Sequence, residues 1–379
     1  MAETGQRRRF FQLRVWHGMT VRAWLTMLLR NGFRIAPRRW YLVLLITAAS
    51  VVNSTLALVQ RLALGRRIDR TELPPDPLFI LGHWRSGTTL LHELLGLDAR
   101  HACPSTYACL APSHFLISQR LLAPWLRWLL PARRSQDDVV VGFEQAQEDE
   151  WALCALGLPS LYQTAAFPNR DAHDWQYADL EGLVPAVRRR WISAWTRLLR
   201  CVALGAPGKR LVIKSPLHLA RIEAALEVFP DARFVHIVRE PQAVFASTLR
   251  LWQRLAEDEG LQAPQADRLR PFVLENYVRA YESFERQCSR IPPGRLCQVR
   301  YEDLVADPVG QVRRIYEHLD LGGFDAVRPM LEMRALQAAG FRTNRLSLSP
   351  EEARLVKLRW GPLAAKFGGY GREGELCAA

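Results

Sequence analysis

The chain has 379 residues, of which 49% are hydrophobic and 23% are charged. This composition excludes a disordered or fibrous protein, and the length suits one large α/β domain with an insert or two smaller domains. The formal net charge of +13 favours an anionic partner. Charge alone does not choose among nucleic acid, anionic lipid and a polyanionic small ligand.

Residues 1–74 are predicted to form a basic, helical N-terminal extension that ends at a proline-rich break. Within this extension, residues 41–60 carry no charge and are long enough to span a bilayer. Thr47, Ser50 and Ser54 nevertheless recur at helical spacing, so one face of this helix is polar. Three placements remain open for it: packing on its own domain, lying on a membrane surface, and spanning the membrane.

The cysteines and the N-terminus bear on the cellular compartment. The seven cysteines are scattered, with no CxxC pair and no histidine at zinc-ligand spacing, which predicts reduced, mostly structural thiols and no metal site. The N-terminus lacks the compact apolar run and cleavage site of a signal peptide. We therefore expect a cytoplasmic protein, with peripheral membrane contact through the basic N-terminal helices as an open alternative.

The rest of the chain alternates short apolar runs with helical patterns. Residues 77–82 read as a buried strand, followed at once by a glycine-flanked loop and a helix. Residues 100–205 are rich in tryptophan and helical signal and are predicted to form a helical insert. Three further strands are expected at residues 210–214, 233–238 and 295–301. This order predicts a P-loop-type α/β fold with three layers around a central parallel sheet.

The glycine-flanked loop carries the most informative motif. Gly82 and Gly87 keep the spacing of a Walker A loop and Thr89 keeps its hydroxyl, but Thr88 stands where the lysine belongs. Successive backbone N–H groups of such a loop, with a helix N-terminus behind them, still form an anion cradle. Arg85, inside the loop, supplies the missing positive charge.

The segment GHWRSGTTLLHELL at residues 82–95 resembles the P-loop region of the sulfotransferases, in particular a bacterial branch of that family. The resemblance implies that residues 75–379 form a sulfotransferase domain whose insert binds the acceptor. It also implies a 3′-phosphoadenosine-5′-phosphosulfate donor and transfer without a metal ion. The donor's 5′-phosphosulfate is then expected at Arg85, Ser86, Gly87, Thr88 and Thr89, with Arg85 also contacting the leaving phosphate.

A second motif pairs Arg239, at the end of a predicted strand, with Ser247 two helical turns later. An arginine and a hydroxyl so placed can converge on one phosphate. The family resemblance assigns this pair to the donor's 3′-phosphate, and places Tyr301 near the adenine, although core packing is an equal alternative for that ring. It also implies that residues 360–371 form a loop that closes over the nucleotide.

Catalysis needs a cation at the transferring group and a base for the acceptor hydroxyl. Lys214 ends the predicted strand at residues 210–214 and matches the family's catalytic lysine. The base is less well defined. His218, one helical turn past Lys214, is the first candidate, and Glu148 or Glu150 of an acidic cluster is the alternative.

These motifs predict an enzyme that moves a sulfuryl group to the hydroxyl of a carbohydrate, lipid or other small molecule, with no role for nucleic acid. The alternatives are a P-loop kinase or NTPase and a non-enzymatic nucleotide-binding protein at a membrane surface. The missing Walker lysine, and the absence of an aspartate ending the strands at residues 210–214 and 233–238, disfavour the NTPase. The sequence does not predict the oligomeric state.

Overall fold

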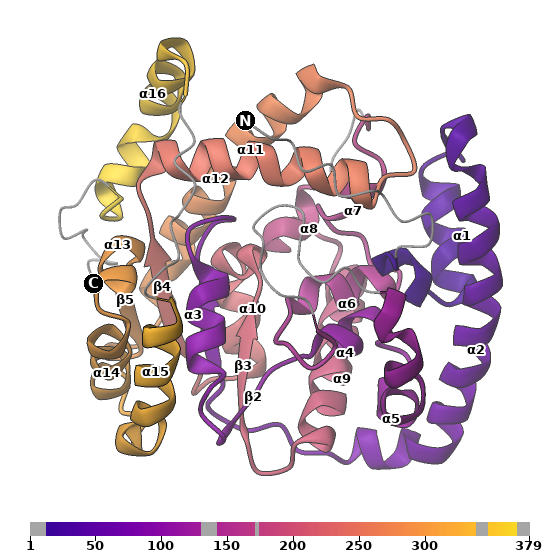
Figure 1. Ribbon diagram of the computed structural model, residues 1–379, viewed down its shortest axis with the longest axis horizontal. Helices are drawn as coiled ribbons and strands as arrows, with labels where there is room; N and C mark the ends of the chain where they lie inside the picture. The colour runs from indigo at the N-terminus through magenta and orange to yellow at the C-terminus, as the bar shows by residue number, and fades with distance from the viewer. Residues whose placement is uncertain (1–12, 130–141, 171–173, 339–347, 370–379) are drawn as a thin grey trace.

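The central element of the computed structural model is a five-stranded sheet in which all neighbouring strands are parallel, in the order β2-β3-β1-β4-β5 (Figure 1). The structure describes residues 13–129, 142–170, 174–338 and 348–369. The strands are β1 (Leu78–Leu81), β2 (His101–Ala102), β3 (Arg210–Lys214), β4 (Arg233–Val238) and β5 (Leu296–Arg300). The predicted α/β fold with a central parallel sheet is confirmed.

Helices account for most of the remaining described residues. The α-helices are α1 (Val21–Arg30), α2 (Trp40–Asp69), α3 (Thr88–Leu95), α4 (Thr106–Leu110), α5 (Phe115–Leu126), α6 (Asp149–Ala155), α7 (Gln163–Ala166), α8 (Gln176–Asp179), α9 (Pro185–Gly205), α10 (Ile222–Val228), α11 (Pro241–Asp258), α12 (Ala266–Gln287), α13 (Tyr301–Ala306), α14 (Pro308–His318), α15 (Phe324–Ala338) and α16 (Pro350–Lys366). Short 3₁₀ turns are η1 (Val15–Gly18), η2 (Pro37–Arg39), η3 (Arg127–Leu129), η4 (Pro216–Ala220) and η5 (Cys288–Arg290).

Both faces of the sheet are buried, which explains why its strands read as continuous apolar runs. Successive side chains of β1 alternate between two cores. Leu78 and Ile80 join a core with residues of α3, α14 and α15, whereas Phe79 and Leu81 join a larger core with residues of α4, α6, α9, α11 and α12. The larger core lies on the side where the chain also packs its N-terminal helices (Figure 1).

Helix α2 is long and apolar enough to cross a membrane by length and composition. In the structure it packs on α1, η1, α5 and α9, with Ser50 and Asn53 buried in the contact. Of the three placements left open for this helix, the structure shows the polar face packed on its own domain.

Three expectations need correction. The two-residue strand β2 was not predicted, because a strand this short leaves no periodic signal. Residues 360–366, expected in a loop, instead continue α16, where Trp360 is buried and stacks on Tyr277 with ring centroids 3.9 Å apart; residues 370–371 lie outside the described part. Cys288 is disulfide-bonded, whereas five cysteines are free thiols as expected: Cys103, Cys109, Cys154, Cys201 and Cys297.

Candidate active site

The loop between β1 and α3 has the geometry of an anion-binding P-loop. Gly87 has a φ of 107°, and a Cβ there would lie 2.4 Å from the Tyr301 ring, so the position requires glycine. Gly82 lies so close to β4 that a Cβ would meet the Ile237 carbonyl oxygen at 2.8 Å. Arg85 is held at a φ of 67°, a backbone conformation that residues other than glycine rarely adopt. The loop is therefore a specialised conformation and not an ordinary turn.

The predicted donor-binding residues from distant parts of the chain meet at this loop. Arg85 Nε donates to Ser247 Oγ at 2.8 Å, and Arg239 Nη1 donates to the Arg85 carbonyl oxygen at 3.0 Å. The Arg239 guanidinium lies over the Tyr301 ring, 4.1 Å from its centroid. Burial and the nearby Arg85 lower the pKa of Arg239, although arginine remains protonated at neutral pH. Two cations held this close together are a ready site for a polyanion.

Lys214 ends β3 and is almost fully buried, at 2% exposed. Its Nζ lies 2.7 Å from Glu148 Oε1, which makes an ion pair between residues 66 positions apart in the chain. Lys214 is paired in register with Ile80 of β1, two residues before the P-loop begins. Because the carboxyl ends of parallel strands meet at one edge of the sheet, the ion pair and the P-loop share that edge.

The three acidic residues 148–150 pair, in the order of the sequence, with three basic residues between positions 214 and 221. His218 Nε2 lies 2.9 Å from both carboxylate oxygens of Asp149, and Arg221 Nη1 lies 2.5 Å from Glu150 Oε2. All four side chains are buried. Burial acts to raise the pKa of Asp149, but its contacts with His218 hold that pKa below the usual value. His218 and Glu150, both candidates for the base, therefore lie in closed internal pairs, whereas Glu148 adjoins Lys214.

Two aromatic residues that the sequence did not single out connect the P-loop to Glu148. Trp84 Nε1 donates to the Tyr162 hydroxyl at 3.0 Å, and that hydroxyl in turn donates to Glu148 Oε2. Burial and the Glu148 carboxylate raise the pKa of Tyr162 well above its usual range, so the phenol keeps its proton and remains a donor. The carboxylate of Glu148 is thus held from two sides, by Lys214 and by Tyr162.

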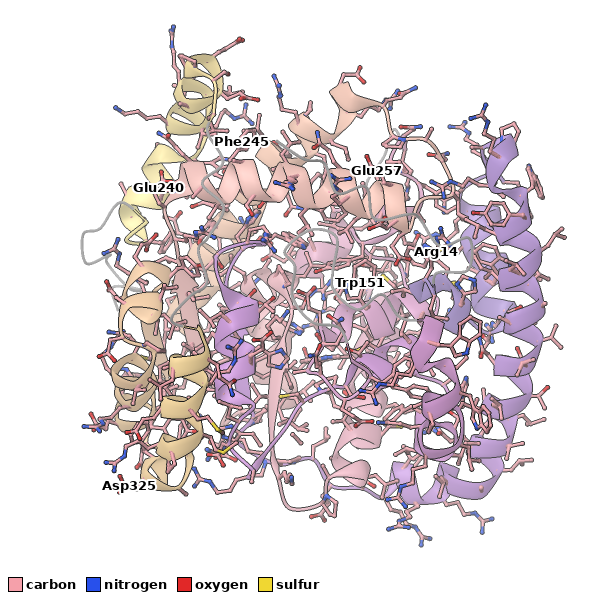
Figure 2. All side chains as sticks on the ribbon, in the orientation of Figure 1. Arg14, Trp151, Glu240, Phe245, Glu257 and Asp325 are labelled. Carbon is pink, nitrogen blue, oxygen red and sulfur yellow. The ribbon has the colours of Figure 1, made fainter. Side chains whose placement is uncertain are left out.

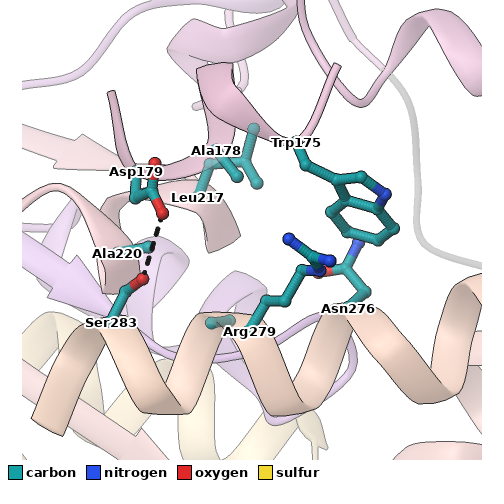
Figure 3. Close-up of a pocket in the computed structure, with 9 residues that line it drawn as sticks. Trp175, Ala178, Asp179, Leu217, Ala220, Asn276, Arg279 and Ser283 are labelled. Carbon is teal, nitrogen blue, oxygen red and sulfur yellow. Dashed lines mark hydrogen bonds between the residues drawn. The ribbon is translucent and has the colours of Figure 1, made fainter. Parts of the chain in front are cut away.

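A pocket elsewhere in the molecule is not part of this site. It lies among α8, η4 and α12, where Arg279 and Asn276 face Trp175 and Asp179 (Figure 3). None of the predicted site residues lines it. In the described parts of the chain there is also no group of three or more His, Cys, Asp and Glu residues that could hold a metal ion.

The fold and this site define a P-loop protein of the α/β class, with clustered arginines at the loop and a lysine–carboxylate pair at the same sheet edge. The sequence model of the Sulfotransferase family matches residues 77–326. The chain belongs to the sulfotransferase family, and it is an enzyme. This membership sets aside both the kinase or NTPase and the non-enzymatic alternative.

Similar proteins of known activity support the assignment. The chain is 40% identical to the omega-hydroxy-beta-dihydromenaquinone-9 sulfotransferase Stf3 of Mycobacterium tuberculosis over 354 residues, which cover 93% of this chain and 91% of that protein. It is 31% identical to a protein-tyrosine sulfotransferase of Drosophila melanogaster over 123 residues, 32% of this chain and 23% of that protein.

Solved structures agree on the fold. Sulfotransferase STF9 from Mycobacterium avium superposes with a TM-score of 0.66 at 21% identity, covering 96% of this chain and 98% of that one. Sulfotransferase STF1 from Mycobacterium tuberculosis superposes with a TM-score of 0.65 at 21% identity, covering 90% and 91%.

Proposed function

We propose that this sulfotransferase takes its sulfuryl group from 3′-phosphoadenosine-5′-phosphosulfate and transfers it to a lipid hydroxyl without a metal ion. The observation that carries the proposal is the meeting of two sites at one sheet edge: the Arg85–Ser247–Arg239 cluster and the Lys214–Glu148 pair. The first suits a nucleotide with several phosphates. The second suits the transfer itself.

The donor contacts follow from the chemistry of the loop. The main-chain N–H groups and hydroxyls of Ser86, Gly87, Thr88 and Thr89 bind the 5′-phosphosulfate, because a helix N-terminus and a P-loop favour an anion. Arg239 and Ser247 bind the 3′-phosphate, and Tyr301, whose ring already carries a guanidinium on one face, borders the adenine. Arg85 contacts the 5′-phosphate that leaves.

In the transfer step the acceptor oxygen attacks sulfur in line, and the bond from sulfur to the 5′-phosphate oxygen breaks. The product nucleotide is 3′-phosphoadenosine-5′-phosphate. Glu148 takes the proton of the acceptor hydroxyl, while Lys214 and Arg85 stabilise the negative charge that develops on the sulfuryl and leaving oxygens. We assign the base to Glu148 and not to His218. A base must reach the acceptor, but the His218 ring is buried and its Nε2 is bonded to the buried Asp149 carboxylate.

The acceptor is proposed to be a long apolar molecule with a terminal hydroxyl, bound by the helical insert of residues 100–205. The support is the 40% identity to a sulfotransferase named for a hydroxylated menaquinone, over 91% of that protein. A buried aromatic cluster next to Glu148, formed by Trp84, Trp151, Tyr162 and Trp252, gives the site apolar surroundings, which suit an apolar body better than a sugar.

Transfer of radiolabelled sulfate tests the proposal directly. The enzyme is incubated with labelled donor and, separately, with a hydroxylated isoprenoid quinone in detergent, a simple phenol and an oligosaccharide. We expect the label to appear in the quinone and in neither of the other acceptors. Labelling should be equally strong with and without an excess of chelator. Label in the oligosaccharide would contradict the acceptor class, and activity that depends on added Mg²⁺ would contradict the mechanism.

A further inference from the structure

One face of helix α2 is apolar and exposed, even though the opposite face is packed on the protein. Among the described residues, Leu44 is 71% exposed and Leu62 is 78% exposed. We call the exposed residues on this side the α2 apolar face: Leu44, Val51, Val52, Leu58, Val59 and Leu62. They recur at intervals of three, four and seven, so they form a stripe along most of the helix. A solvent-exposed apolar stripe of this length indicates a binding partner.

The packed face of α2 shows how the helix is oriented. Asn53 Nδ2 donates to the carbonyl oxygens of His17 at 2.6 Å and Met19 at 3.0 Å. The Gln60 amide donates to the Ser113 carbonyl oxygen at 3.0 Å and accepts from the Leu116 backbone N–H at 3.0 Å. These bonds fix α2 along the side of the domain. Spanning a bilayer would break them and expose polar groups to lipid, so the helix is built to lie flat.

The exposed apolar surface continues from α2 onto α1 and the turn between them. Leu25 and Leu29 of α1, Phe33 in the turn and Trp40 at the start of α2 are all exposed. A tryptophan with one apolar and one polar edge is typical of the boundary between lipid and water. Figure 1 places α1 and α2 along one edge of the molecule, and side chains project outward from that edge in Figure 2.

Nearly all the charged residues on α1 and α2 are basic. Between Glu3 and Asp69 the sequence contains no acidic residue, but it contains many arginines. Exposed arginines lie at both ends of α2, including Arg38 before it and Arg66 and Arg67 in its last turns. An apolar stripe flanked by arginines complements a membrane that carries anionic lipid headgroups, whereas a protein partner would not require charge at both ends.

We propose that α1 and α2 form a membrane-docking surface, with the α2 apolar face inserted at the level of the lipid headgroups and the arginines on anionic lipids. This surface is connected through η1 to the start of α6, beside the proposed base Glu148. Helix α2 contacts η1, and η1 contacts α6, which begins at Asp149, next to Glu148. The ring centroids of Trp16 in η1 and Trp151 in α6 are 6.3 Å apart; Figure 2 labels Trp151 and the nearby Arg14. Docking therefore brings the site to the surface where an apolar acceptor resides.

Vesicle flotation of the full chain tests this surface without any enzyme assay. The probes are vesicles of phosphatidylcholine alone and of phosphatidylcholine mixed with phosphatidylglycerol. We expect the protein to float with the mixed vesicles, to float weakly with the neutral ones, and to be released by high salt because screening weakens the arginine contacts. Equal binding to both vesicle types, or none to either, would overturn the proposal.

Two variants, each with four exposed apolar residues replaced by glutamine, test whether the α2 apolar face is the part that binds. The replaced side chains are similarly exposed in both variants but lie on different helices. The test variant carries Leu44→Gln, Val51→Gln, Leu58→Gln and Leu62→Gln, and the control carries Met330→Gln, Met333→Gln, Leu336→Gln and Leu358→Gln. The control positions lie on α15 and α16, at the opposite edge of the molecule (Figure 1). We expect the test variant to lose on the order of 100-fold in vesicle partitioning because four apolar side chains no longer enter lipid. The control should bind like the wild type.

The charge contribution is tested separately with Arg38→Gln, Arg66→Gln and Arg67→Gln combined. Each arginine near an anionic surface strengthens binding about five-fold, so this variant should lose on the order of 100-fold on mixed vesicles and little on neutral ones. Both variants should unfold at the wild-type temperature, since the substituted side chains are exposed.

Three further outcomes would overturn the proposal. The first is a test variant that binds vesicles as the control does. The second is a wild-type dimer that the test variant alone converts to a monomer, with no vesicle binding, because the α2 apolar face would then be covered by a second copy of the chain. The third is resistance of membrane-bound protein to extraction with alkaline carbonate, which releases peripheral proteins but not spanning helices. Since none of these measurements uses the donor or an acceptor, they stand apart from the proposed function.

Discussion

Replacing Lys214 by methionine separates charge stabilisation in the transition state from donor binding. Methionine keeps the length and the apolar stem of lysine, so the packing at this 2% exposed position is largely preserved. If Lys214 neutralises charge that develops only during transfer, kcat should fall by about 10²–10³-fold, or about 3–4 kcal/mol. Donor affinity should change only a few-fold, because the P-loop and Arg239 are untouched.

The same substitution also leaves the Glu148 carboxylate without its partner at 2.7 Å. Removing one member of a buried ion pair costs about 3–5 kcal/mol, so Lys214→Met should unfold at a lower temperature. The double variant Lys214→Met/Glu148→Gln should recover most of that stability because the uncompensated charge is gone, yet it should stay inactive. The double variant thus separates the loss of stability from the chemistry, and the role of Lys214 in transfer is judged from kcat of the single variant.

The assays are single-turnover transfer of labelled sulfate, calorimetric binding of 3′-phosphoadenosine-5′-phosphate, and thermal unfolding. Lys209→Met is the matched control: it removes a lysine from the same stretch of chain, just before β3, and should leave all three measurements near the wild type. A folded Lys214→Met enzyme that retains kcat within about ten-fold of the wild type would refute the role assigned to this lysine.

Three further changes probe the base, the 3′-phosphate contact and a buried acid. Glu148→Gln should lower kcat by about 10²–10⁴-fold, whereas His218→Ala should mainly lower the unfolding temperature; the reverse pattern would return the base to His218. Calorimetry should show 3′-phosphoadenosine-5′-phosphate binding far more tightly than ADP, and Arg239→Ala should abolish that preference; equal affinity in the wild type would count against the contact. Burial raises the pKa of Glu259 to about 7, so its contribution to stability is full below pH 4.5 and is lost as the pH rises to about 7. The unfolding temperature of Glu259→Gln should therefore rise relative to that of the wild type as the pH increases over this range. A difference between the two temperatures that stays constant with pH would show that Glu259 does not titrate there.

The sheet could be predicted from the sequence because its strands are buried on both faces. The runs at residues 210–214 and 233–238 are β3 and β4 as found, and the glycine spacing located the P-loop between β1 and α3. The C-terminal segment could not be predicted in the same way. Its glycines suggested a loop, but burial of Trp360 against Tyr277 holds residues 360–366 in α16, and such a contact between helices 83 residues apart leaves no local signal.

The site was predictable where a motif fixes the position of a residue along a strand or loop. Arg239 and Ser247 were expected to converge, and the structure does bring both to Arg85. The sequence could not rank the candidate bases, because the position of His218 shortly after a strand does not reveal whether its side chain is exposed or buried. Its burial comes from Phe79 and Trp195, whose rings lie 5.5 Å and 5.6 Å away. The cytoplasmic location, the domain boundary at residue 74 and the roles given to the site residues stay predictions.

The three consecutive acids explain how one of them comes to be available for chemistry. Asp149 and Glu150 pair internally with His218 and Arg221, and Trp195 Nε1 adds a bond to Asp149 at 2.8 Å. Because their partners lie in α9, in η4 or just after η4, the two buried pairs fix the start of α6 against these elements. Glu148 immediately precedes this anchored helix, so its carboxylate is positioned at Lys214. Preorganisation of this kind is what a base and a neighbouring cation need, since a shift of about 1 Å can cost on the order of 100-fold in rate.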